Sequence, residues 1–169
     1  MQAWEEEYVE YVTARLPALR RLGYLLCGSE DGADDLVQQT ITSLYVHWKR
    51  ASAATHMDAY VRQMLVRVFL DEKRRPWSRV RLTDAPPDRP ARDASSVEDR
   101  MVLRAALRKV PRRQRAVLVL RFLYDLPVHE VAALLSCSEG TVKSQTSHGL
   151  AALRRLLGEQ TLAALAKGV

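Results

Sequence analysis

The sequence predicts an all-α protein in which two helical domains are joined by a flexible linker. Apolar residues recur at three- and four-residue spacing near both ends of the 169-residue chain, which indicates amphipathic helices. This period stops between residues 80 and 95, where three prolines and charges of alternating sign mark a linker. No sheet pattern competes. We therefore expect domains at 1–79 and 96–158, the linker at 80–95, and a C-terminal tail at 159–169.

The first two helices are predicted from their apolar stripes. One runs over about 4–26 and is stopped by Gly28, and the next runs over about 33–50. Residues 29–32 form a turn and cap between them, and their acidic side chains suit the positive end of a helix dipole. The stripe residues are Tyr8, Val12, Leu16, Leu19, Leu22 and Leu26 in the first, and Leu36, Val37, Thr40, Leu44, Tyr45 and Trp48 in the second.

Acidic residues gather near the start of the second helix. Asp31, Asp34 and Asp35 could suggest a metal site, but they lack the alternating oxygen ligands and distal Glu of a calcium loop. Helix-start acids are the simpler structural explanation. A third interpretation is a docking surface for a basic partner, because Asp35 and Gln38 lie one turn apart and point the same way.

A third helix is predicted over 59–75, after a loop of small residues at 51–57 and a cap at Asp58. It ends in a basic cluster with an aromatic residue. The cluster runs over residues 73–79, and its basic and aromatic members are Lys73, Arg74, Arg75, Trp77 and Arg79. Basic residues at a helix end suit the dipole, whereas basic residues near Trp48 and Tyr60 would also suit unstacked bases and phosphates. The sequence alone leaves both interpretations open.

The second domain is expected to begin with a helix at Ser96, where Ser96 and Asp99 resemble a capping box. Pro111 opens another helix. Its apolar residues are Val117, Leu118, Leu120, Phe122 and Leu123. Arg112, Arg113 and Arg115 are candidates for phosphate contact, although a solvated helix face is an equal explanation for each.

Residues 128–157 organise this domain as two helices joined by a tight turn at 136–138. Pro127 suits the start of the first helix, and Ser138 can cap the second by accepting a hydrogen bond from an amide one turn on. A helix-turn-helix usually has Gly in its turn, and Ser136 stands there instead. The predicted buried residues are Val131, Ala132, Leu134 and Leu135, then Val142, Thr146, Leu150 and Leu153.

The opposite face of the second of these helices carries small and polar residues with a cation at the edge. They are Gly140, Thr141, Lys143, Ser144, Ser147 and His148. Low bulk, hydrogen-bonding groups and a cation are what a helix in the DNA major groove needs. The alternative is a helical hairpin with an ordinary solvated face.

The net charge of +6 is confined to one part of the chain. Residues 1–80 carry 11 basic and 11 acidic side chains, and residues 81–96 carry three of each. Residues 97–169 carry 12 basic against 6 acidic side chains. A basic segment that coincides with a helix-turn-helix favours a polyanionic partner.

The cellular compartment of the protein is indicated by its two cysteines and by its N-terminal residues. Cys27 and Cys137 are far apart and have no companion at metal-ligand spacing. Met1 leads into the acidic run Glu5–Glu7 and not into a signal peptide, and no apolar run approaches a membrane span. We expect a cytoplasmic protein that needs no cofactor or metal.

Three stretches carry a family resemblance: Glu130–Ala132 with Gly140–Ser147, Asp34–Thr40, and Ala59–Arg62 with Arg74–Arg75. With them the chain resembles a bacterial extracytoplasmic-function (ECF) sigma factor of the sigma-70 family, similar to the actinobacterial SigE-like branch. The resemblance covers about residues 8–157 in the family's own order.

The resemblance implies a promoter-specific transcription initiation factor that is not an enzyme. By this resemblance the core polymerase, through its largest subunits, would be bound by Asp35, Gln38 and Gln39. The −35 element would be read by Arg113, Thr141, Lys143, Ser144, Ser147 and His148. The −10 element would be opened and read by Trp48, Tyr60, Arg67, Lys73, Arg74 and Arg75, with a flipped base held near residues 50–57. Arg67 and His148 stand where the family often has Asn and Arg, respectively.

Two other functions remain open from the residues alone. An autonomous helix-turn-helix regulator would bind an operator as a dimer without polymerase, but only the short tail is left to form a dimerisation helix. A metal enzyme built on Asp31, Asp34 and Asp35 would lack a paired His, a nucleophile or a phosphate loop. Anti-sigma factors are common in the wider group, so one is a candidate partner.

Overall fold

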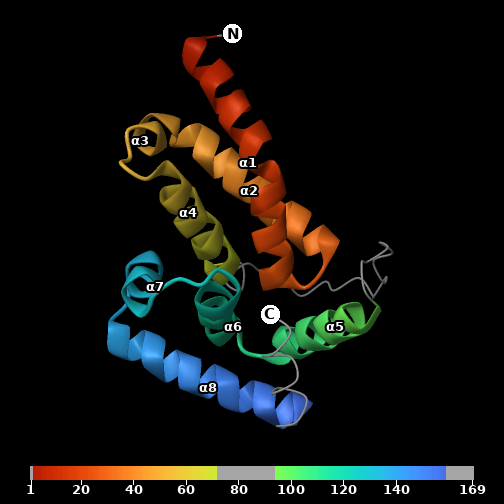
Figure 1. The fold of residues 1–169 in the computed structure, drawn as a ribbon. Helices are drawn as coiled ribbons and strands as arrows, with labels where there is room; N and C mark the ends of the chain where they lie inside the picture. The colour runs from red at the N-terminus through yellow and green to blue at the C-terminus, as the bar shows by residue number, and fades with distance from the viewer. Residues whose placement is uncertain (1, 72–93, 159–169) are drawn as a thin grey trace. The chain divides into compact units, whose positions relative to one another are not determined.

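A computed structural model describes residues 2–71 and 94–158, and every regular element in these two segments is helical, as predicted (Figure 1). The chain divides into two compact units, Met1–Arg81 and Leu82–Val169, which we describe separately. Most of the predicted linker at 80–95 lies outside the described residues. Its last two positions already belong to a helix.

Unit 1 contains α1 (Ala3–Cys27), α2 (Glu30–Val46), α3 (Trp48–Ser52) and α4 (Met57–Asp71). Figure 1 shows α1 lying along α2 and α4 packed on α2. The short α3 joins α2 to α4 at one end of the unit. Gly28 ends α1 in the left-handed conformation, at φ 75°, as its position predicts. The most deeply buried large side chains of this unit are Leu22, Leu26, Leu36, Leu44, Leu65 and Phe69.

The second predicted helix is longer at its start and broken near its end. The expected turn at 29–32 is instead the first turn of α2, because the Ser29 Oγ accepts from the Gly32 N–H at 3.2 Å and caps it. At the other end the chain leaves helical geometry at His47, whose Nδ1 lies 2.8 Å from the Ser43 carbonyl oxygen. Trp48, directly after the break, is buried, whereas Tyr45 is 44 % exposed. Tyr45 still faces α1 as predicted, because its ring packs on Trp4 and Tyr8 with centroid distances of 5.2 Å to each.

Helix α4 begins at Met57, two residues earlier than expected. Asp58 therefore lies inside its first turn and is not the predicted cap. The side chain of Asp58 instead accepts hydrogen bonds from residues of α1. Residues 72–75, the end of the predicted helix, lie outside the described residues.

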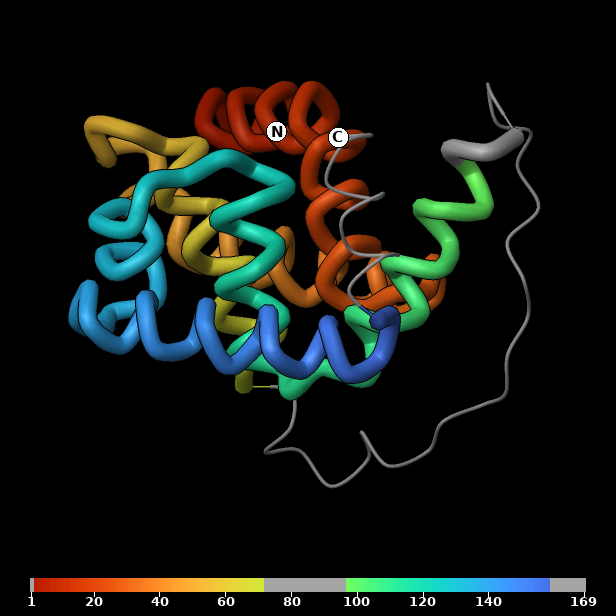
Figure 2. Tube along the Cα trace, turned by 60° about the horizontal axis from the view of Figure 1, so that its bottom comes forward, coloured from red at the N-terminus to blue at the C-terminus, as the bar shows by residue number. Residues whose placement is uncertain are grey.

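Unit 2 contains α5 (Ala94–Lys109), α6 (Arg112–Leu118), a π-helical turn η3 (Val119–Leu123), α7 (Val128–Leu135) and α8 (Glu139–Leu157). Figure 2 follows the chain through these elements, with α8 passing both α6 and α7. The residues buried between them include Val110, Val117, Leu120, Val131, Val142 and Leu153.

The start of unit 2 departs from prediction at one helix boundary. Helix α5 already begins at Ala94, so Ser96 is not its cap. Pro111 is the N-cap residue of α6 and so stands at the start of that helix, as expected.

The helix that Pro111 precedes widens into η3, where the Tyr124 N–H donates to the Val119 carbonyl five residues back, at 3.0 Å. This wider turn shifts the helical register. It leaves Phe122 48 % exposed, contrary to its predicted place on the apolar face.

The helix-turn-helix is present where the sequence predicts it. Ser138 caps α8 by accepting from the Thr141 N–H at 3.1 Å, and Val142 is fully buried between α7 and its neighbours. Ser136 ends α7 with φ 52°, the left-handed conformation that Gly adopts more easily. Over the described residues, no helix has the length and apolar character to span a membrane.

Candidate functional site

The outer face of α8 exposes most of the residues predicted to contact the −35 element. Lys143, Ser144, Ser147 and His148 are all exposed, while Val142, Gly149 and Leu153 on the other side are buried. Thr141 is partly buried, and its Oγ1 lies 2.9 Å from the Ser138 Oγ at the cap. The cap thus orients the first turn of the face that would meet DNA.

The three arginines of α6 do not behave alike. Arg113 is exposed on the first turn of α6 and is free to face a phosphate. Arg115 is only 8 % exposed, and its Nη2 donates to the carbonyl oxygens of Arg108 at 2.7 Å and Val110 at 3.0 Å. Arg115 therefore stabilises the carbonyl end of α5, and its interpretation as a phosphate contact is wrong.

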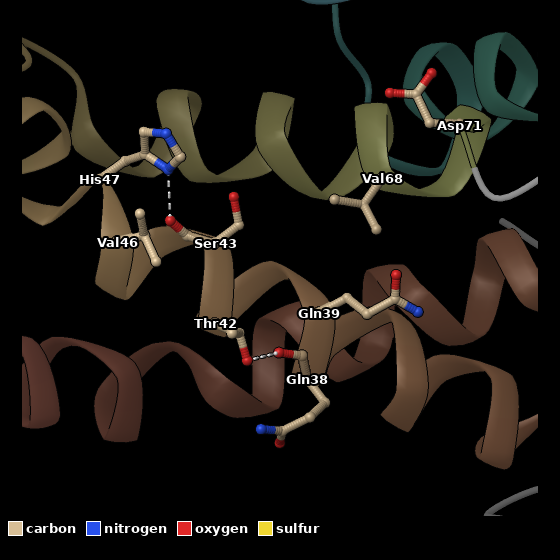
Figure 3. A pocket seen from close by; sticks show the side chains of 8 residues that line it. All are labelled: Gln38, Gln39, Thr42, Ser43, Val46, His47, Val68 and Asp71. Atoms are coloured by element: carbon tan, nitrogen blue, oxygen red, sulfur yellow. Dashed lines mark hydrogen bonds between the residues drawn. The ribbon is translucent and has the colours of Figure 1, made fainter. Parts of the chain in front are cut away.

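The predicted polymerase-binding residues lie on one stretch of α2. Asp35 and Gln38 are exposed and Gln39 is partly buried. Both glutamines line an open depression of about 460 Å³ between α2 and α4 (Figure 3). Its other lining residues are Thr42, Ser43, Val46, His47, Val68 and Asp71. A surface that combines amides, an acid and exposed Val46 suits a protein partner better than a small ligand.

One of the acidic residues at the start of α2 forms an ion pair with the neighbouring helix. Asp34 pairs with Arg20 of α1 at 2.8 Å, and Asp31, Asp34 and Asp35 are all exposed. In the two described segments, no group of three His, Cys, Asp or Glu side chains is placed to hold a metal ion.

The residues predicted for the −10 element are only partly available. Trp48 is 6 % exposed, and its ring packs on Tyr8 and Tyr11 at centroid distances of 5.4 and 5.9 Å. A buried ring offers no face to a base, so Trp48 is a core residue here. Tyr60 is partly exposed and Arg67 is exposed, both on α4. Lys73, Arg74 and Arg75 lie outside the described residues.

A set of side chains missed by sequence reasoning joins α1 to the start of α4. The Tyr11 hydroxyl donates to Asp58 Oδ1 at 2.8 Å, and Arg15 forms an ion pair with the same carboxylate at 2.9 Å. The available signal was the four-residue spacing of Tyr11 and Arg15, which places both on one face of α1. The contacts of Asp58 with α1 were not predicted, because an Asp just before a predicted helix is typical of a helix cap.

Opposing effects set the pKa of Asp58. Burial alone would raise it, but the hydrogen bonds from Tyr11 and Arg15, with the charges of Arg15 and Arg62, lower the pKa below its ordinary value of 3.8. The pKa of Tyr11 is raised, by burial first and then by its bond to Asp58. Both groups therefore keep the protonation states that maintain this link at neutral pH.

Comparison with known proteins agrees with both units. A family model described as Sigma-70 region 2 matches residues 11–79, and one described as Sigma-70, region 4 matches residues 100–153. The RNA polymerase sigma-E factor of Streptomyces coelicolor is 34 % identical over 165 residues, which cover 95 % of this chain and 91 % of that protein. The chain belongs to the ECF group of the sigma-70 family.

Other relatives of this sigma factor extend the similarity. The ECF RNA polymerase sigma factor SigM of Mycobacterium tuberculosis is 31 % identical over 147 residues, covering 83 % of this chain and 71 % of that protein. The fold also matches the sigma factor RpoE of Bartonella quintana, solved in complex with the anti-sigma factor NepR. That match has a TM-score of 0.67 at 22 % identity and covers 91 % of this chain and 98 % of the other.

Membership of the family settles the class of activity. The chain is a non-catalytic initiation factor that binds core RNA polymerase and directs it to promoters. The autonomous operator-binding regulator and the metal enzyme are therefore set aside.

Proposed function

We propose that three surfaces divide the work of promoter recognition. Asp35, Gln38 and Gln39 on α2 dock on the largest subunits of core polymerase. The exposed face of α8, with Arg113 of α6, reads the −35 element. The loop before α4, with Tyr60, Arg67 and the basic residues that follow α4, holds melted −10 bases.

The observation that carries this proposal is the two-sided character of α8. Its buried side packs on α6 and α7, so its orientation within unit 2 is fixed. Its other side presents short polar side chains and Lys143, which can approach base edges and phosphates without steric hindrance. The capped N-terminal turn adds a favourable end for a phosphate.

Charge distribution supports a need for polymerase. Residues 1–80 are neutral in net charge, so the −10-binding unit contributes little non-specific attraction to DNA. We therefore infer that the free protein binds duplex DNA weakly and that the polymerase supplies the remaining contacts.

The compartment and a further partner are also proposals. We place the protein in the cytoplasm, at the nucleoid, because that is where its polymerase and promoter partners are. An anti-sigma factor is a proposed regulator, since the solved sigma factor of Bartonella quintana is held by one.

The test of docking is size-exclusion co-migration with bacterial core RNA polymerase. Wild type should co-migrate, and Asp35→Ala/Gln38→Ala should elute free, because two exposed contacts on α2 are lost. Asp31→Ala is the matched control, since it removes an exposed acid from the first turn of the same helix.

Two results would count against the proposal. If wild type stays apart from core polymerase yet shifts duplex DNA alone, polymerase-dependent function fails. If wild type, the double variant and Asp31→Ala all co-migrate equally, the docking residues lie elsewhere.

A further inference from the structure

The loop at residues 53–56 is flanked by α3 and α4, and one tyrosine of α1 contacts both flanks. The ring of Tyr11 packs against Trp48, the first residue of α3, at 5.9 Å between centroids. Its hydroxyl donates to Asp58, in the first turn of α4, at 2.8 Å. The two helices that flank the loop therefore both contact Tyr11 of α1.

Arg15 strengthens the second anchor. Its Nε lies 2.9 Å from Asp58 Oδ1 and its Nη2 lies 2.9 Å from Oδ2, so the guanidinium holds both carboxylate oxygens. The same guanidinium lies over the Tyr11 ring, 6.0 Å from its centroid. Two-point contact fixes direction as well as distance, which a single ion pair does not do.

The loop itself is short and closed at each end by the backbone. The Ala54 N–H donates to the Ala51 carbonyl at 3.1 Å, and the Tyr60 N–H donates to the His56 carbonyl at 3.0 Å. Between these bonds Ala53, Thr55 and His56 are exposed. Small and polar side chains on a loop with fixed ends suit a site that encloses one unstacked base.

We propose that Tyr11, Arg15 and Asp58 are positioning residues that fix the loop 53–56 for capture of an unstacked −10 base. This inference rests on the proposed function of unit 1. The three side chains contact no DNA themselves; they hold the geometry of the loop that does.

The weakness of this link as a stabiliser supports a positioning role. The Arg15 and Asp58 side chains are 50 % and 53 % exposed, and ion pairs so exposed add little to folding stability. A loop already held in its binding geometry loses less conformational entropy when it closes on a base. Removing the link should therefore affect base capture more than folding.

The chain offers closely matched controls on the same helix. Tyr11→Phe removes the hydroxyl bond to Asp58, while Tyr8→Phe removes a 2.7 Å hydroxyl bond to the Ile41 carbonyl of α2. Arg15→Gln breaks the pair with α4, while Arg20→Gln breaks an equally exposed 2.8 Å pair with Asp34 of α2. Each control variant removes the same kind of interaction, but one that joins α1 to α2 and leaves the contacts with α4 in place.

The experiment uses reconstituted holoenzyme and a promoter fragment that the wild-type holoenzyme selects from randomised duplex DNA. A 2-aminopurine in the −10 segment reports unstacking. A second selection, randomised only in that segment, reports base preference. Affinities for core polymerase and for a −35 duplex are measured alongside, with thermal unfolding of each variant.

Tyr11→Phe and Arg15→Gln should reduce opening by about two- to fivefold, the scale of a lost exposed ion pair or hydrogen bond, and flatten base preference within the −10 segment. Tyr8→Phe and Arg20→Gln should match wild type in both. All four should keep wild-type affinity for core polymerase and the −35 duplex.

Two outcomes are distinguishable failures. If wild type opens the promoter but Arg15→Gln behaves as Arg20→Gln does, and Tyr11→Phe as Tyr8→Phe, the positioning role is overturned alone. If wild-type holoenzyme selects no promoter, the proposed function fails and this inference fails with it.

Discussion

Gly149 of α8 packs directly against Leu118, the last residue of α6. A Cβ placed there would lie 2.9 Å from Leu118 Cδ1 and 3.0 Å from its Cγ, and Leu118 is only 3 % exposed. We expect Gly149→Ala to lower the free energy of unfolding of unit 2 by about 1–3 kcal/mol, because the buried leucine must move. Urea unfolding measures this change.

Gly140→Ala is the control for Gly149→Ala, because both lie in α8. A Cβ at Gly140 meets nothing nearer than the Ser138 Oγ at 3.7 Å. This substitution should raise stability by about 0.5–1 kcal/mol, through the lower entropy of the unfolded chain and better helix propensity. Equal effects at the two glycines would contradict close packing at Gly149.

Asp58→Asn should change the pH dependence of unfolding. The lowered pKa of Asp58 means that its contribution is fully present above the ordinary value of 3.8 and is lost as pH falls through the lower value in the folded protein. Wild type should therefore be modestly more stable than Asp58→Asn at pH 7. The difference should vanish in acid unfolding well below pH 3.8; a constant difference at all pH values would contradict the ionic link.

Single side chains were the hardest features to predict from the sequence. Asp58 and Arg115 carry charges that sequence reasoning assigns to solvent, a cap or DNA, yet each bonds to groups that only the fold brings near. Trp48 was predicted both in an apolar stripe and as a stacking surface, and only its burial decides between them. Local pattern does not contain these distant partners.

The turn of the helix-turn-helix allows opposite predictions at two serines. Ser136 occupies a left-handed conformation at φ 52°, so Ser136→Gly should stabilise unit 2 by about 1 kcal/mol. Ser138 caps α8 through the Thr141 N–H at 3.1 Å, so Ser138→Ala should destabilise it by about 1 kcal/mol. Thermal unfolding measures both changes: relative to wild type, Ser136→Gly should raise the unfolding temperature and Ser138→Ala should lower it. Shifts of the same sign would contradict the turn geometry.

At the scale of elements, sequence periodicity predicts the helices well and their interruptions poorly. Gly28, Pro127 and Ser138 act locally, and the structure places each at a helix boundary as expected. The break at His47 and the π-helical turn η3 were not foreseen, since neither has a glycine or proline at the site. Each irregularity lies beside a buried side chain, Trp48 in one unit and Leu120 in the other, whose packing partners are distant in sequence.

For the whole molecule, prediction of the all-α fold succeeded because the signals were long. Two periodic segments and a proline-rich interval predicted two helical parts, and the family models match residues in each. The assignments of individual contacts to polymerase, −35 DNA and −10 DNA remain predictions.

The separation of charge between the two parts leads to a last prediction, on the salt dependence of promoter binding. All of the net +6 lies in residues 97–169, and Lys143 is a basic residue on the exposed face of α8 that is predicted to meet DNA. If Lys143 contacts one phosphate, Lys143→Gln should weaken holoenzyme binding and make the slope of log affinity against log salt shallower by about 0.9. Fluorescence anisotropy of a labelled promoter fragment over a salt series measures the slope.

Lys109→Gln is the control for this change, because it removes the same charge from an exposed position at the end of α5. It should leave the slope unchanged, since counterion release depends on contacts with phosphate and not on the total charge of the protein. If both variants alter the slope equally, the basic excess attracts DNA only as a diffuse field. In that case α8 would not be the surface that meets the −35 element.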